Sequence, residues 1–185
     1  MANTLRVAID LGSTVSVMGW QWFSSGENKP FPVGEIKIAQ YPTLILEQKD
    51  NPMLGQDLFG EEAQDLLEKN NGGVLFAKNG FKKKLLFPET KEEHAEGIRL
   101  TEKFFGFLYK CFQEDSPLPK GESAKSELYL TVPMSTNHAS IQELERIAEK
   151  SGFSRTNGFQ ITVLNEAQCL VDYAFFDCKD GVKYT

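Results

Sequence analysis

The sequence predicts a mixed α/β fold in which an antiparallel meander of strands is followed by alternating strands and helices. Apolar runs separated by short polar turns occupy residues 7–39, and a long amphipathic helix is expected at 91–112. From residue 128 onward, strand and helix patterns alternate. Tight turns join antiparallel strands, whereas strands separated by helices pair in parallel through right-handed crossovers. We therefore expect a mixed sheet flanked by helices.

The first predicted element is a β-hairpin at residues 7–17, whose turn combines a carboxylate, a glycine and two hydroxyl side chains. Gly12 is expected to give this turn unusual backbone dihedrals, so that consecutive N–H groups form an anion-binding concavity. Asp10 is suited to hold Mg²⁺, directly or through water, because this ion prefers hard oxygen ligands. The turn has the composition of a phosphate site, and an ordinary acidic hairpin turn is the alternative interpretation.

The next segments are expected to extend the meander and then to form a helix. Side chains at 35–39 alternate between apolar and polar, and residues 42–47 are typical of another short strand. Residues 61–69 have apolar side chains on one helical face and end at a run of asparagine and glycine. A cluster of lysines around Phe81 follows.

The helix expected at 91–112 carries apolar side chains three and four positions apart, which favours one buried face. These side chains are Ile98, Thr101, Phe105, Leu108 and Phe112. We interpret them as part of the core rather than as contacts to a cofactor.

The C-terminal part of the chain is expected to alternate strands and helices. In chain order the elements are a surface loop at 115–126, a strand at 128–133, a helix at 139–151, a strand at 159–164 and a helix at 166–176. Asn137 and Ser140 are equally suitable to cap the first of these two helices. Together with the meander, this order describes a ribonuclease-H-like sheet. We expect a core subdomain at 1–40 and 90–185, with a smaller inserted subdomain at 41–89.

The composition is that of a globular protein, with 41% hydrophobic and 25% charged residues and a formal net charge of −6. Such an acidic chain lacks the basic face that nucleic acid or an anionic membrane requires, so neither is an expected partner. The three cysteines form no CxxC pair and predict neither a disulfide framework nor a zinc site. Because no signal-peptide pattern or transmembrane-length apolar stretch occurs, we expect a cytoplasmic location.

Four segments, taken in order along the chain, resemble the nucleotide-binding domain of the seventy-kilodalton heat-shock chaperones (DnaK type). They also resemble the wider superfamily of actin, sugar kinases and heat-shock ATPases. The segments are Asp10-Leu11-Gly12-Ser13-Thr14, Pro42-Thr43 with Leu54-Gly55, Thr131-Val132-Pro133, and Val163-Leu164-Asn165-Glu166-Ala167. The resemblance implies an actin-like ATPase lobe that binds ATP or ADP together with Mg²⁺.

The resemblance also implies roles for the residues of the first turn. Gly12, Ser13, Thr14 and Val15 would contact the β- and γ-phosphates through backbone N–H and hydroxyl groups. Asp10 would hold the hydrated Mg²⁺.

A lysine and a second acid complete the site that the resemblance implies. Lys83 best fits the family's catalytic lysine, which contacts the γ-phosphate and the attacking water, and Lys82 and Lys84 are the alternatives in register. Glu166 resembles the family's acidic residue near the metal. Sites of this kind act by positioning and charge neutralisation. A solvated surface is the alternative interpretation of the lysine cluster.

Two departures from the family pattern concern the coupling of ATP to a further domain. Ala167 stands where the family has a proline, and residues 134–138 lack the aromatic residues common at that place. The resemblance therefore supports nucleotide binding more firmly than it supports such coupling. His138 is expected to be a surface residue at the start of a helix, and no function is expected for His94, which lies in an acidic run.

For the whole protein, the resemblance implies ATP hydrolysis that controls the binding of unfolded polypeptide, with co-chaperones as partners. The chain is expected to be the first lobe, without the second phosphate loop and the adenosine pocket, and therefore inactive alone. Two alternatives remain: a sugar or acid kinase of the same superfamily, and a non-catalytic actin-like scaffold.

Overall fold

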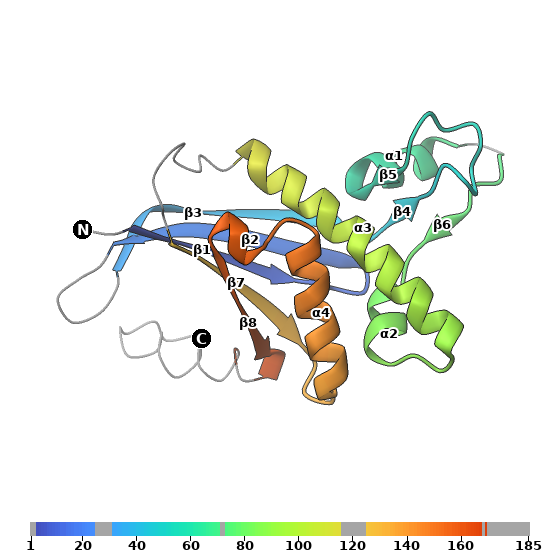
Figure 1. Cartoon of the computed structure of the whole chain (residues 1–185). Coiled ribbons are helices and arrows are strands. Elements are labelled where there is room, and N and C mark those ends of the chain that lie inside the picture. Colours follow the sequence, from blue (N-terminus) through green and yellow to red (C-terminus); the bar gives the residue numbers. More distant parts are fainter. Residues whose placement is uncertain (1–2, 25–30, 71–72, 116–124, 168, 170–185) are drawn as a thin grey trace, which may run out of the picture.

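The main sheet of the protein has five strands and combines antiparallel with parallel pairing (Figure 1). The computed structural model describes residues 3–24, 31–70, 73–115, 125–167 and 169. The strands in spatial order are β3 (Phe31–Pro42), β2 (Val15–Ser24), β1 (Asn3–Asp10), β7 (Lys125–Val132) and β8 (Phe159–Asn165). The first three pair antiparallel, whereas β7 pairs in parallel with both β1 and β8. The predicted mixed α/β fold is confirmed.

Two helices, α3 (Lys91–Asp115) and α4 (His138–Lys150), lie over one face of this sheet (Figure 1). The predicted stripe of α3 is confirmed, because four of its five side chains are fully buried and Ile98 packs at the edge of the core. Leu100 and Phe104 are buried as well, so the buried face is wider than the stripe. For α4, Asn137 is the N-cap, since its Oδ1 accepts a hydrogen bond of 2.9 Å from the Ser140 N–H.

The core is dominated by phenylalanine rings that contact one another edge to face or at a tilt. The rings that are buried are Phe81, Phe104, Phe105, Phe112, Phe153 and Phe159. Phe112 lies at the centre of this group, and the indole of Trp20 meets its edge with ring centroids 5.9 Å apart. Both tryptophans, Trp20 and Trp22, belong to β2. The rings therefore join the sheet to α3.

A smaller sheet lies within residues 45–78, which we call the three-stranded unit (Figure 1). Its strands in spatial order are β5 (Leu58–Phe59), β4 (Ile45–Leu46) and β6 (Ala77–Lys78), and the helix α1 (Gly60–Lys69) follows β5. The predicted helix at 61–69 is confirmed. The strand predicted at 42–47 is only two residues long, because β3 continues to Pro42 and Thr43 then donates a hydrogen bond to the Thr14 carbonyl oxygen.

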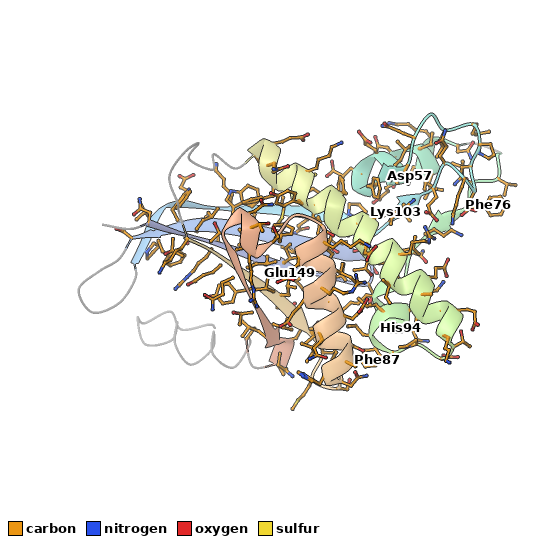
Figure 2. The ribbon with its side chains drawn as sticks, viewed as in Figure 1. Asp57, Phe76, Phe87, His94, Lys103 and Glu149 are labelled. Atoms are coloured by element: carbon orange, nitrogen blue, oxygen red, sulfur yellow. The ribbon has the colours of Figure 1, made fainter. Side chains whose placement is uncertain are left out.

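A cluster of ion pairs joins the three-stranded unit to α3, and two of its members, Asp57 and Lys103, are labelled in Figure 2. The Glu47 side chain is fully buried, and both of its oxygens accept hydrogen bonds from Arg99. Lys103 Nζ lies 2.7 Å from Glu47 Oε1 and 2.6 Å from Asp57 Oδ2. We call these four residues the Glu47 cluster. Burial alone would raise the pKa of Glu47, but the hydrogen bonds from Arg99 and Lys103 outweigh it and lower that pKa to about 2.

A short helix, α2 (Phe81–Leu86), packs against α3 and was not among the elements expected from the sequence. Phe81 contacts Phe104 with ring centroids 5.5 Å apart. The backbone of α2 lies so close to Gly97 that a Cβ atom there would be 2.5 Å from the Leu85 nitrogen. Only a residue without a side chain permits this distance between the two helices.

The remaining sequence predictions fall partly outside the described residues. The strands predicted at 128–133 and 159–164 and the helix at 139–151 are confirmed by β7, β8 and α4. In the loop expected at 115–126, residues 116–124 lie outside the described part of the chain. In the helix expected at 166–176, only residues 166, 167 and 169 are described, and they are helical.

Candidate functional site

The candidate site lies at the carboxyl ends of the three parallel strands, where ligands commonly bind in open α/β sheets. In the register of β1 and β7, Ile9 pairs with Leu130, so Asp10 and Thr131 follow side by side. Thr131 Oγ1 donates a hydrogen bond of 2.8 Å to Asp10 Oδ1. Asp10 is exposed at this edge. Thr131 belongs to Thr131-Val132-Pro133, one of the four segments that carry the resemblance, but the sequence predicted no role for its side chain.

The turn between β1 and β2 requires a glycine at position 12, although not for the expected reason. Gly12 is not among the glycines with a positive φ, so the prediction of unusual dihedrals is wrong. A glycine is required because a Cβ atom at this position would lie 1.8 Å from the Val15 carbonyl oxygen. Ser13 and Thr14 are exposed, and the Gly12 N–H donates to the Asp10 carbonyl oxygen at 3.1 Å.

The far side of this turn is fixed to the start of the three-stranded unit. The Thr14 carbonyl oxygen accepts a hydrogen bond of 2.8 Å from the Thr43 N–H. The hydroxyls of Ser16 and Thr43, both buried, lie 2.8 Å apart. These bonds tie the end of the turn, at Thr14 and Ser16, to Thr43. The sequence predicted no role for Thr43.

The three lysines of α2 point to three different partners. Lys82 Nζ lies 2.9 Å from Glu166 Oε1, and its side chain is only 12% exposed. Lys83 is 71% exposed and lies 3.4 Å from Glu89, also at the surface. Lys84 pairs with Glu96 on α3. Of the three registers considered, the structure therefore brings Lys82, and not the preferred Lys83, to Glu166.

The orientation of α2 explains why Lys82, and not Lys83, lies next to Glu166. Phe81 and Leu85 are buried one turn apart, so they fix the inner face of the helix against α3. Each residue turns the direction of the side chain by about 100°, which separates neighbouring lysines completely. Phe81 and Leu85 are four positions apart in the sequence. A helix of six residues, however, is too short to show a repeated helical spacing of apolar side chains.

Glu166 is held near the same edge of the sheet. Asn165, the last residue of β8, pairs with Val132 at the end of β7. The Asn165 Oδ1 accepts a hydrogen bond of 2.9 Å from the Ala167 N–H, which fixes the turn that carries Glu166. Asp10, Thr131 and the pair of Lys82 with Glu166 thus come from three strand ends and one docked helix.

The arrangement fits a magnesium ion that is bound mainly through phosphate and water. Within the described residues, His, Cys, Asp and Glu side chains form no group of three or more that could hold a metal ion. Mg²⁺ in nucleotide sites requires only one or two carboxylates, because it keeps several waters and takes the remaining ligands from phosphate. Asp10 is such a carboxylate, and its bond from Thr131 occupies only one oxygen.

Several solved structures are similar to this chain over most of its length. The MamK double helical filament matches with a TM-score of 0.59 at 14% identity, covering 94% of this chain and 44% of that one. MreB5 of Spiroplasma citri bound to ADP matches with a TM-score of 0.53 at 12% identity, covering 89% of this chain and 39% of that one. The same protein bound to AMPPNP matches with a TM-score of 0.50 at 14% identity, over the same shares.

These likenesses show that the chain has the ribonuclease-H-like fold of the actin-like ATPases. The chain spans less than half the length of each of these structures. No protein-family model and no curated protein matches it. Among the helices in the described ranges, none has the length and apolar character needed to cross a membrane.

Proposed function

We propose that this chain binds the phosphates of a magnesium-bound adenine nucleotide at the carboxyl ends of β1, β7 and β8. The observation that carries the proposal is the convergence of Asp10, Thr131 and the Lys82–Glu166 pair at this edge, beside a turn that only glycine permits. The solved structures of the same fold with ADP and AMPPNP support the choice of ligand.

Each residue has a proposed role in this site. The backbone N–H groups of Gly12 to Val15 and the hydroxyls of Ser13 and Thr14 bind phosphate oxygens. Asp10 orients the waters of the bound Mg²⁺, and Thr131 holds that carboxylate in place. The ion itself neutralises phosphate charge.

We assign the lysine of the site to Lys82. Its ammonium group is largely buried and is held by Glu166, so it is positioned before the nucleotide binds. In the whole protein, a lysine held in this way would stabilise the charge on the transferring phosphoryl group. Glu166 is then a positioning residue for Lys82 and lies near the metal.

For the whole protein, we propose more specifically a DnaK-type chaperone ATPase, whose partners are unfolded polypeptide and co-chaperones. It rests on the motifs around Asp10 and Glu166. The solved structures favour a second candidate, a filament-forming actin-like ATPase, because one of them is described as a double helical filament. A kinase of the same superfamily would instead need an acceptor-binding insertion. ATP turnover stimulated by unfolded polypeptide would support the chaperone, and polymerisation with nucleotide would support the filament.

Titrating the 185-residue chain with Mg·ATP is expected to shift the amide signals of Gly12, Ser13, Thr14 and Val15 in ¹H–¹⁵N NMR spectra. We expect a dissociation constant weaker than about 100 μM, since the proposed contacts involve only phosphate and metal. In Asp10→Asn, the difference between titrations with and without Mg²⁺ should shrink, because the carboxylate charge is lost.

Asp65→Asn is the matched control, since Asp65 is an exposed carboxylate on α1 that pairs with Lys69. It should leave the magnesium dependence unchanged. If the amide signals of residues 12–15 do not shift at up to about 10 mM nucleotide, the proposed phosphate site is contradicted. Submicromolar affinity would contradict the proposal that this chain supplies only part of a nucleotide site.

Substituting the three lysines one at a time separates Lys82 from its neighbours. Lys82→Ala is expected to weaken Mg·ATP binding on the order of tenfold, because it removes a positioned charge near the phosphates. Lys83→Ala should change the affinity less than twofold, since the Lys83–Glu89 pair is exposed to solvent. Lys84→Ala is the second control. Equal effects of all three, measured by the same NMR titration, would reject the assignment.

A further inference from the structure

A cavity of about 600 Å³ lies between α1 and α3, and it shares no residue with the candidate nucleotide site. Its walls come from the end of β3, from the segment that contains β5 and the start of α1, and from the C-terminal half of α3. Gly106 lines it from α3, and a Cβ atom there would meet nothing within 4 Å. The space above this glycine is therefore open rather than filled by a neighbouring side chain.

Three aromatic rings line the cavity. The rings of Phe59 and Phe107 are stacked, with centroids 5.4 Å apart and 8° between their planes. The rings of Tyr41 and Phe107 are nearly perpendicular, and their centroids are again 5.4 Å apart. All three rings are half-buried and line the cavity. Burial raises the pKa of Tyr41, so its hydroxyl stays neutral. These three side chains therefore give the cavity an aromatic surface without charge of its own.

The rim is mainly acidic. The carboxylates are Asp57, Glu61, Glu62 and Glu114, and the ammonium groups are Lys103 and Lys110. Lys103 pairs with Asp57 at the rim and also with Glu47 outside the cavity, so Glu61, Glu62 and Glu114 are opposed mainly by Lys110. A second hollow, which shares Glu61 and Glu62 with this cavity, adds the carboxylates of Asp65 and Glu68. The aromatic rings of the cavity are thus surrounded mainly by negatively charged side chains.

We propose that this cavity binds an arginine side chain presented by a partner polypeptide. The planar guanidinium stacks on aromatic rings and forms paired hydrogen bonds with carboxylates, and the alkyl stem packs on apolar surface. A lysine ammonium, a compact and strongly hydrated charge, uses the flat rings less well. The net charge of −6 adds attraction for a basic partner.

The test is an NMR titration of the 185-residue chain with N-acetyl-arginine amide, with N-acetyl-citrulline amide as the neutral probe of the same shape. We expect saturable shifts at Phe59, Gly106 and Phe107, with a dissociation constant of about 1 mM for a ligand of this size. Citrulline should bind at least about fivefold more weakly, and added salt should weaken the arginine probe.

Two variants locate the site. Gly106→Leu fills the open space and should abolish the shifts without unfolding the chain, because leucine is a better helix former than glycine. The double variant Glu61→Gln with Glu62→Gln should bring the affinity for arginine close to that for citrulline. Both sites are exposed on α1, so folding should be preserved.

Three outcomes would overturn the proposal. They are the absence of localised shifts up to about 20 mM probe, equal binding of the arginine and citrulline probes, and unchanged binding in a folded Gly106→Leu variant.

Discussion

Replacing Glu47 by glutamine is expected to lower the free energy of unfolding by about 3–5 kcal/mol, because it leaves two half-buried cations, Arg99 and Lys103, without their buried anion. The Glu47 side chain is fully buried and receives bonds from Arg99 and Lys103 on α3. Urea denaturation of both proteins measures the difference.

Glu102→Gln is the matched control for this substitution. Glu102 also lies on α3 and pairs with two cations, Arg146 and Lys150, but it remains in contact with solvent. Its loss should cost about 1 kcal/mol or less. If the two variants lose the same stability, the Glu47 cluster contributes no more than a surface pair.

The same carboxylate makes stability depend on pH in a defined direction. The pKa of Glu47 is lowered from 4.5 to about 2 in the folded chain, so the unfolded chain binds the proton more readily. Its stabilising contribution is complete above the unfolded value and is lost as the pH falls from about 5 towards 2. Asp57 and Glu96, whose pKa values are also lowered, add to this loss.

The stability difference between the chain and Glu47→Gln should therefore narrow over this pH interval. Denaturation at several pH values measures it. A difference that stays constant over the whole interval would show that folding does not lower the pKa of Glu47.

Replacing Gly97 by alanine is expected to destabilise the chain by about 1–3 kcal/mol, because the added methyl group collides with the backbone of α2. Its Cβ atom would lie 2.5 Å from the Leu85 nitrogen and 2.7 Å from the Lys84 carbonyl carbon. Backbone atoms cannot rotate away, so α2 must move. Since α2 carries Lys82, the NMR signals of Lys82 and Glu166 should shift in the folded variant.

Gly106→Ala is the control on the same helix. A Cβ atom at Gly106 has no neighbour within 4 Å, and alanine favours a helix by about 0.5–1 kcal/mol relative to glycine. This variant should be slightly more stable than the parent chain. Thermal denaturation that gives both glycine variants the same change would contradict the close approach at Gly97.

The elements with strong periodicity or turn chemistry could be predicted from the sequence. The hairpin around Asp10, the long helix α3 and the alternation from β7 to β8 all follow local patterns that tertiary contacts only reinforce. The short helix α2 could not be predicted, because its six residues are held by the packing of Phe81 and Leu85 rather than by a repeated pattern.

The site shows the same division between local and long-range information. Asp10 and Gly12 were visible as a local motif, even though the reason for Gly12 is proximity to Val15 and not its φ angle. The choice among the three lysines depends on how α2 docks onto α3, and the partner of Lys82 is 84 positions away. The burial of Glu47 likewise depends on cations 52 and 56 positions further along the chain.

The position of the two tryptophans determines what fluorescence can report about this molecule. Trp20 and Trp22 both belong to β2, whereas residues 45–78 contain no tryptophan. Intrinsic emission therefore follows the environment of the five-stranded sheet, including the edge-on contact of Trp20 with Phe112. If the three-stranded unit opens by itself, the emission stays constant while circular dichroism loses helix signal from α1. Unfolding curves that coincide for the two probes thus mean that the two sheets unfold as one cooperative unit.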